Sequence, residues 1–205
     1  MILKDSEKEL ISKEIENLEK LSSAQLVAVI AKRSSNYKYA SLMICVFLVF
    51  LSFFVLFFIK EVSTLELLQY QLLIFVGLNL LFEKFDNLIL KILPRNYKQR
   101  KASLYAKEQF SNLGLSRTKS KQAIMFFVSF DERYVKVITD NKISQEIPNE
   151  FWQQLVFEFA EDVKREDFLN GYLKAIRTSK AILIKHFPIQ KDSENELSNE
   201  VIELL

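Results

Sequence analysis

Cysteine, histidine, glycine and proline are scarce in this sequence, and each shortage excludes a class of protein. A single Cys rules out an intrachain disulfide and a cysteine-built zinc or iron–sulfur site, and a single His rules out paired-histidine metal motifs. Three Gly and three Pro in 205 residues rule out a collagen-like chain and a turn-rich β-sandwich. The net charge of +2 gives no reason to expect a nucleic-acid partner.

Phenylalanine is abundant, with 18 residues, and many of them lie in one apolar run. Residues 40–59, ASLMICVFLVFLSFFVLFFI, contain no charged side chain. A helix rises about 1.5 Å per residue, so a run of this length crosses a hydrocarbon core of about 30 Å. A buried helix of a soluble protein is the alternative, but a chain of 205 residues has little core in which to hide a helix that is apolar on every face. The run therefore predicts a transmembrane helix.

A second uncharged run, residues 67–82, is shorter and contains Gln69, Gln71 and Asn79. Because it follows the first run so closely, it predicts the returning helix of a transmembrane hairpin over residues 40–93, with 60–66 as the linker. The three polar side chains have two interpretations. They either form hydrogen bonds across to the first helix or lie at the membrane interface.

Lysine and arginine are distributed unequally around this hairpin. Several of them flank its outer ends, whereas the linker holds only Lys60. Cytoplasmic loops carry the excess of Lys and Arg, so we expect two helices in the inner (plasma) membrane, with both termini and the soluble part of the chain in the cytoplasm. We expect four of the basic residues to contact anionic lipid head groups, with phosphate binding as the alternative: Arg95, Lys98, Arg100 and Lys101.

The segments on either side of the hairpin contain both helix and strand patterns. In residues 1–39, the capping box formed by Ser6 and Glu9 predicts a helix start, and the branched apolar run 25–31 predicts a buried strand. In residues 94–190, we expect a helix over 96–113, a strand hairpin over 123–130 and 134–140, and helices after Pro148 and Asp167. Residues 191–205 are polar and predict a mobile tail or a short docking helix.

Neither soluble segment can bury a sheet by itself. The strand at 25–31 has no partner within its own segment, and the hairpin at 123–140 needs a further strand and a covering layer. The two segments therefore predict one split α/β domain, interrupted by the membrane hairpin.

The strand hairpin and the helices after it resemble the TPM domain family. Asp131-Glu132-Arg133 is similar to the family's short charged turn between two strands, and Glu166-Asp167-Phe168 with Gly171 is similar to its later Gly-Asp-Tyr-like step. The whole chain resembles the bacterial branch in which a membrane hairpin interrupts the domain. The resemblance implies an α/β/α sandwich on a small mixed sheet. The loop Asp140-Asn141-Lys142 departs from the family's glycine-rich pattern.

The same resemblance implies two different functions. Some members are accessory subunits of membrane complexes, and others are similar to weak acid phosphatases with metal bound at acidic loops. We expect the first for this chain, an inner-membrane accessory protein without catalytic residues, whose cytoplasmic domain binds or supports a membrane protein complex. The alternative is a phosphatase-like hydrolase at the membrane surface that depends on calcium or magnesium.

Five carboxylates are candidates for such a metal site, because calcium needs several oxygen atoms converging on one ion. In the alternative interpretation these carboxylates bind no metal and belong to a solvated turn and a helix cap. Arg133 either pairs with one of these carboxylates and has a structural role, or binds the phosphoryl oxygens of a substrate. No nucleophile elbow, Walker loop or pair of catalytic carboxylates occurs in the sequence. The five candidates are Asp131, Glu132, Asp162, Glu166 and Asp167.

Overall fold

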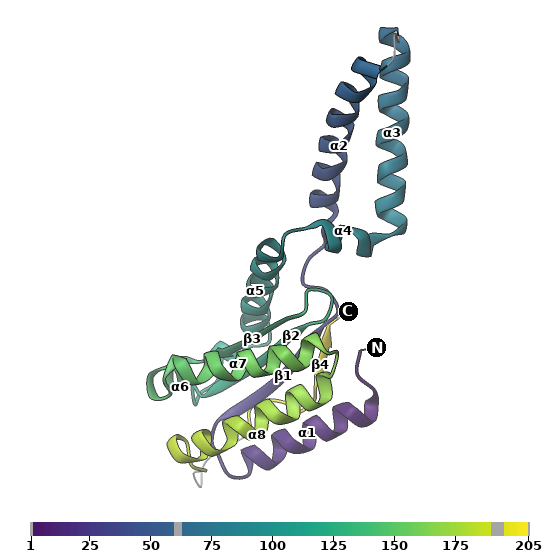
Figure 1. The fold of residues 1–205 in the computed structure, drawn as a ribbon. Helices are drawn as coiled ribbons and strands as arrows, with labels where there is room; N and C mark the ends of the chain where they lie inside the picture. The colour runs from purple at the N-terminus through teal and green to yellow at the C-terminus, as the bar shows by residue number, and fades with distance from the viewer. Residues whose placement is uncertain (1, 60–62, 190–194, 205) are drawn as a thin grey trace. The chain divides into compact units, whose positions relative to one another are not determined.

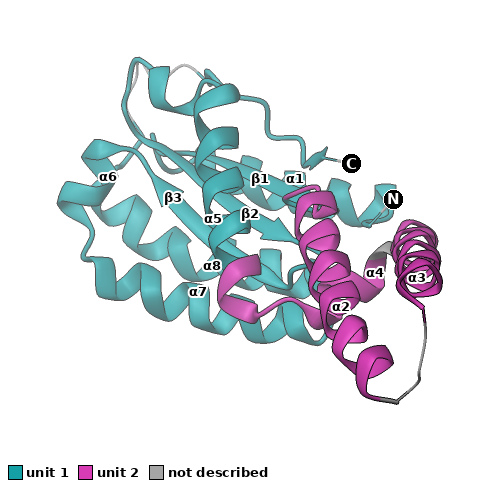
Figure 2. Cartoon of the chain, turned by 90° about the horizontal axis from the view of Figure 1, so that it is seen from above, with its two compact units in different colours: residues 1–34, 99–205 teal, residues 35–98 magenta. Residues whose placement is uncertain are grey.

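The computed structural model describes residues 2–59, 63–189 and 195–204 (Figure 1). The chain divides into two compact units, drawn in different colours in Figure 2. One unit consists of residues 1–34 and 99–205, and the other of residues 35–98. The second unit is thus an insertion in the sequence of the first.

The first unit is built on a four-stranded mixed sheet with the order β3-β2-β1-β4. Strand β1 (Gln25–Ala31) runs parallel to β2 (Ala123–Ser129) and to β4 (Ile202–Leu204), whereas β3 (Tyr134–Thr139) is antiparallel to β2. The three strands predicted from the sequence are therefore present. The N-terminal strand lies at the centre of the sheet, although 91 residues separate its last residue from the first residue of its partner β2 (residues 32 to 122).

Helices cover both faces of this sheet. One layer consists of α1 (Asp5–Glu19), α7 (Asn149–Lys164) and α8 (Phe168–His186), and the other of α5 (Arg95–Asn112) with the short η1 (Leu115–Arg117). Alternate residues of β1 serve the two layers: Leu26, Ala28 and Ile30 pack in one core cluster, and Val27, Val29 and Ala31 pack in the other. This arrangement confirms the predicted α/β/α sandwich.

Two contacts fix α8 against its neighbours. A Cβ atom placed on Gly171 would lie 2.8 Å from the ring of Phe159 in α7, so the two helices approach closely only because residue 171 is glycine. The hydroxyl of the fully buried Tyr172 donates a hydrogen bond to the carbonyl oxygen of Val29 at 2.7 Å. This bond ties α8 to the central strand.

The second unit contains α2 (Lys38–Ile59), α3 (Thr64–Lys84) and the short helix α4 (Asp86–Ile92). The first two are long and apolar enough to cross a membrane, with mean hydropathies of 2.9 and 1.6, and only 6% of each apolar window is buried. Between the two helices, the Ser52 hydroxyl donates to Gln71 Oε1 at 3.4 Å. Asn79 instead donates to the carbonyl of Phe75 in its own helix. Residues 60–62 of the predicted linker lie outside the described residues.

The structure corrects four local predictions. Helix α1 begins at Asp5, and its capping carboxylate is Glu7, which accepts the amide of Lys4 at 2.7 Å. The predicted capping residue Glu9 instead pairs with Lys13. The loop expected after β3 is the short helix α6 (Asn141–Glu146), capped by Asp140. Helix α4 was not predicted. Part of the segment 191–205, predicted as a mobile tail or a docking helix, instead forms β4 at Ile202–Leu204. Residues 191–194 and 205 of this segment lie outside the described residues.

Candidate functional site

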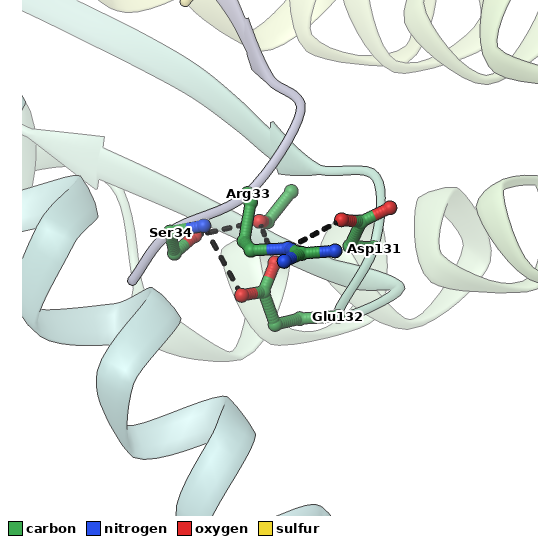
Figure 3. A network of polar contacts seen from close by, with 5 residues as sticks. Arg33, Ser34, Asp131 and Glu132 are labelled. Atoms are coloured by element: carbon green, nitrogen blue, oxygen red, sulfur yellow. Dashed lines mark hydrogen bonds and ion pairs between the residues drawn. The ribbon is translucent and has the colours of Figure 1, made fainter. Parts of the chain in front are cut away.

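The charged turn between β2 and β3 meets the chain where it leaves β1. Because β1 and β2 are parallel, their carboxyl ends lie side by side, and the pairing continues past both strands. The amide of Phe130 donates to Ala31 O at 2.9 Å, and the amide of Asp131 donates to Lys32 O at 3.0 Å. The turn therefore lies beside residues 33 and 34 (Figure 3), which directly precede the inserted unit.

Asp131 forms an ion pair with Arg33. The Nε of Arg33 lies 2.7 Å from Asp131 Oδ2, and the two side chains are 22% and 13% exposed. Such a charge-assisted hydrogen bond, shielded from much of the solvent, is stronger than a typical surface pair. The carboxylate of Asp131 is thus engaged by a cation of the same chain.

Glu132 is buried and accepts hydrogen bonds from its neighbours (Figure 3). Its Oε1 accepts the amide of Ser34 at 3.1 Å, and its Oε2 accepts the hydroxyl of Ser129. The hydroxyls of Ser34 and Ser129 lie 2.6 Å apart. Ser129 is 0% exposed and Ser34 is 6% exposed, so neither hydroxyl is open to a substrate as a nucleophile. We call residues 33, 34, 129, 131 and 132 the β1-exit network.

Arg133 extends from the same turn to the corner between α7 and α8. Its Nη2 lies 2.7 Å from Glu166 Oε1, and both side chains are 57% exposed. Both residues have positive φ angles, 47° for Arg133 and 62° for Glu166, a region that residues other than glycine rarely occupy. To clamp a phosphoryl group, Arg133 would have to give up this partner or share it.

The remaining two candidate carboxylates lie near that corner. Asp167 caps α8, where its side chain accepts the amide of Asn170 at 3.3 Å and the side-chain amide of Asn170 at 2.8 Å. Asp162 accepts the amide of Asp167 through its backbone carbonyl at 3.0 Å. One side-chain oxygen of Asp162, Oδ2, is buried and has no hydrogen-bond partner among the described residues.

The five carboxylates thus serve different local structures. Among residues 2–59, 63–189 and 195–204, no group of three His, Cys, Asp or Glu side chains is arranged to hold a metal ion. The described residues therefore do not fit the predicted calcium or magnesium site in this arrangement. The site itself stays a prediction, which a hydrolysis assay can test.

The basic residues that follow the hairpin have different surroundings. Arg95 and Arg100 are exposed, whereas Lys98 and Lys101 are half-buried. The ammonium group of Lys98 donates to the carbonyl of Leu90 at 2.6 Å and so satisfies one of the last carbonyls of α4. Lys98 keeps two further N–H donors for a lipid head group.

A small open pocket of about 70 Å³ lies at the opposite end of β1, and the sequence analysis did not predict it. Its lining includes Glu19, Ser23, Gln25 and Asn195. Burial raises the pKa of Glu19 to about 7, against the opposing effect of hydrogen bonds from the Leu26 amide and the Asn199 side chain. Ligand pockets are commonly about 300–1,000 Å³, so this one is too small for most metabolites.

Arg33 and Ser34 were not predicted as partners of the turn. Charged and hydroxyl residues just past the end of a buried strand are a usable signal, because side chains at the carboxyl ends of adjacent parallel strands lie close together. That signal becomes informative only once β1 is known to pair with β2.

Comparisons with known proteins concern the family and the fold of the chain. The family model of the TPM domain matches residues 87–182, which contain the charged turn and the α7–α8 corner. A similar solved fold is the NMR structure of BA42 protein from the psychrophilic bacteria Bizionia argentinensis sp. nov., with a TM-score of 0.59 and 16% identity over 98% of this chain and 94% of that chain. At this identity the likeness concerns the fold alone. No curated protein matches the sequence.

Proposed function

Because the chain belongs to the TPM domain family, we propose that it is a non-catalytic accessory protein of the inner membrane. In this proposal, α2 and α3 anchor the chain, both termini and the α/β unit lie in the cytoplasm, and the α/β unit binds or supports a membrane protein complex. Anionic lipid head groups around Arg95, Lys98, Arg100 and Lys101 complete the set of partners.

The observation that carries the proposal is the insertion of an apolar hairpin into an α/β domain. Residues 35–98 interrupt the domain, and only 6% of the apolar window of each long helix in this unit is buried. Exposed apolar area on this scale is not stable in water and is typical of contact with lipid. The Lys and Arg residues outside the hairpin then favour cytoplasmic ends.

The β1-exit network supports the non-catalytic part. Its carboxylates and hydroxyls are bound to one another, to Arg33 or to a backbone amide, and its serines are buried. A phosphoryl-transfer site needs a positioned nucleophile and a cationic clamp that face the substrate. The network is better suited to holding the two chain segments together at the point where the hairpin begins.

Topology reporters test the membrane placement. A reporter that is active only in the cytoplasm should be active when fused after Leu205 and inactive when inserted at Ser63. Equal activity at the two positions would contradict the hairpin.

Affinity capture tests the accessory role. The full chain, solubilised in detergent from its own cells, should retain one membrane protein complex in fixed stoichiometry. A matched bait that contains only residues 35–98 should not retain it, because it lacks the α/β unit. Retention by both baits would assign the interaction to the membrane segment and contradict a role of the α/β unit.

Hydrolysis of a phosphate monoester separates this proposal from the metal-dependent alternative. We expect no hydrolysis above background by the full chain, with or without calcium or magnesium. A rate that rises with metal and is lost in Asp131→Asn, but not in Asp5→Asn, would make the charged turn an active site. Circular dichroism of both variants would show that the loss is not unfolding.

A further inference from the structure

Helix α4 has an apolar side that its own unit leaves uncovered. Phe85, which caps its start, and Leu88 and Ile92 are 55%, 37% and 48% exposed. Their spacing of three and four residues places them along one side of the helix. The helix runs across the end of α3 and not along it (Figure 1), so it does not extend the membrane span.

The other apolar residues of α4 are packed within the same unit. Ile89 and Leu90, 3% and 7% exposed, form a small core cluster with Tyr37 from the start of α2. The carbonyl of Leu90 accepts the hydrogen bond from Lys98 already described. Two contacts on different chain segments therefore hold α4 in its crosswise position and leave Phe85, Leu88 and Ile92 exposed.

Basic residues flank these three residues in the sequence, and Tyr37, Tyr39 and Tyr97 lie in the same unit. Lys84, Lys91 and Arg95 are exposed, and the ammonium of Lys84 lies 5.7 Å from the ring centre of Phe85. Tyr39 is 85% exposed at the start of α2, and the rings of Tyr37 and Tyr97 are 6.4 Å apart. Tyrosine is enriched at membrane interfaces, and basic residues next to an apolar helix side bind anionic lipid surfaces.

We propose that α4 is an in-plane membrane anchor, with Phe85, Leu88 and Ile92 embedded among the acyl chains of a leaflet that contains anionic lipid, and with Lys84, Lys91 and Arg95 at its head groups. The inference rests on the proposed function, because it places α4 at the end of a membrane hairpin. It adds a third, crosswise lipid contact that fixes how deeply the hairpin lies. The lipid surface is favoured over a protein partner because the exposed apolar side is continuous in the chain with α3 and is flanked by basic residues.

Site-directed spin labels can measure this placement in the full chain. Cys45 is the only cysteine, so a Cys45→Ala background accepts single labels at Leu88→Cys and Ile92→Cys. Phe54→Cys in α2 is the reference for the bilayer core, and the exposed Gln153→Cys in α7 is the reference for water. Collision with oxygen and with a water-soluble nickel chelate gives the depth of each label in lipid nanodiscs.

We expect the labels at 88 and 92 to lie about 5–10 Å below the head groups, in the acyl region like the label at 54, while the label at 153 stays in water. They should lie deeper in nanodiscs with one third anionic lipid than in purely zwitterionic ones, and a Lys84→Gln/Lys91→Gln variant should lose that shift. Circular dichroism and the label at 54 confirm that each variant is folded and inserted.

Three results would overturn the inference. Labels at 88 and 92 that collide with the nickel chelate as often as the label at 153, while the label at 54 stays deep, would place α4 in water and leave the membrane hairpin intact. Labels inaccessible to both reagents would indicate a protein partner or a second copy. Depths that do not depend on anionic lipid would exclude the charge contribution. A label at 54 in water would instead contradict the proposed membrane function.

Discussion

The two units use the same apolar residue types in opposite ways. All seven residues of β1 are buried between two helical layers, whereas α2 and α3 keep only 6% of their apolar windows buried. A water-soluble unit buries such residues, because exposing each one to water costs free energy. Its apolar segments are therefore separated by segments with polar surface residues. The apolar residues of the hairpin are not buried in this way. The difference shows that apolar content identifies a core only when the surrounding solvent is known.

The two helical glycines sharpen this comparison. In the α/β unit, a Cβ atom on Gly171 would collide with the Phe159 ring, while no heavy atom lies within 4 Å of a Cβ atom on Gly77 in α3. Glycine is therefore required for close helix packing at position 171, whereas no neighbouring atom requires it at position 77. Substitutions that act on one unit only are the direct way to break or refine the contrast.

The largest expected effect comes from removing β1. Residues 99–205 alone lack the central strand, so we expect no cooperative thermal transition. A fusion of residues 1–34 to 99–205 through a short Gly-Ser linker restores the sheet and should be soluble with one sharp transition. A sharp transition in the shorter piece would show that the sheet does not require its N-terminal strand.

Gly171→Ala should be the next most damaging change. The added methyl group meets a buried ring that has little room to move, and overpacking of this kind costs about 1–3 kcal/mol, reduced by the roughly 1 kcal/mol better helix propensity of alanine. Trp152, the only tryptophan, is 7% exposed in α7, and its fluorescence reports unfolding of the α/β unit in the full chain. The matched control Gly77→Ala should leave this transition unchanged. Equal loss in both variants would argue against close packing at Gly171.

Substitution of the two arginines near the charged turn should have smaller effects on stability, and the two effects should differ. Arg33→Ala leaves the mostly buried Asp131 without its cation and should cost about 1 kcal/mol, the lower end of the range for an unpaired buried group, because water still reaches part of the pair. Arg133→Ala removes an exposed pair and should cost less than about 1 kcal/mol. Urea unfolding followed by Trp152 fluorescence measures both. A greater loss for Arg133 would point to a role in the α7–α8 corner beyond this ion pair.

Much of the fold follows from local patterns in the sequence. Strands β1, β2 and β3 have long runs of branched or aromatic residues, and the long helices have clear ends such as Gly114, which has a φ of 72°. The mixed sheet itself required a further step, namely that neither flanking segment is complete alone.

The elements that were missed depend on distant contacts. Strand β4 has only three residues in an acidic stretch, and its position is fixed by pairing with β1 and by the ion pair of Glu203 with Lys8 at 2.6 Å. Helix α4 is held by Tyr37 and Lys98, and the charged turn by Arg33 and Ser34. Apart from Lys98, which follows α4 by six residues, these partners are distant in sequence, so local patterns do not reveal them.

The smallest expected effect concerns Glu19 at the far end of β1. Its pKa in the folded chain, about 7, lies above the ordinary value of 4.5 because of burial. Between pH 4.5 and 7 the folded state therefore keeps a proton that the unfolded state releases, and the contribution of Glu19 to stability falls as pH rises through that range and is constant above it. Glu19→Gln removes this dependence, since a neutral amide keeps an oxygen for the Leu26 amide.

The variant should gain stability relative to the parent as pH rises from 5 to 8, by on the order of 1 kcal/mol. Comparing parent and variant at each pH cancels the titration of all other groups. The control is Glu16→Gln, whose carboxylate is exposed and has its pKa lowered by Lys20, so its difference from the parent should not rise in this way. A difference for Glu19→Gln that is flat between pH 5 and 8 would show that Glu19 is solvated and that the segment around Asn199 does not shield it.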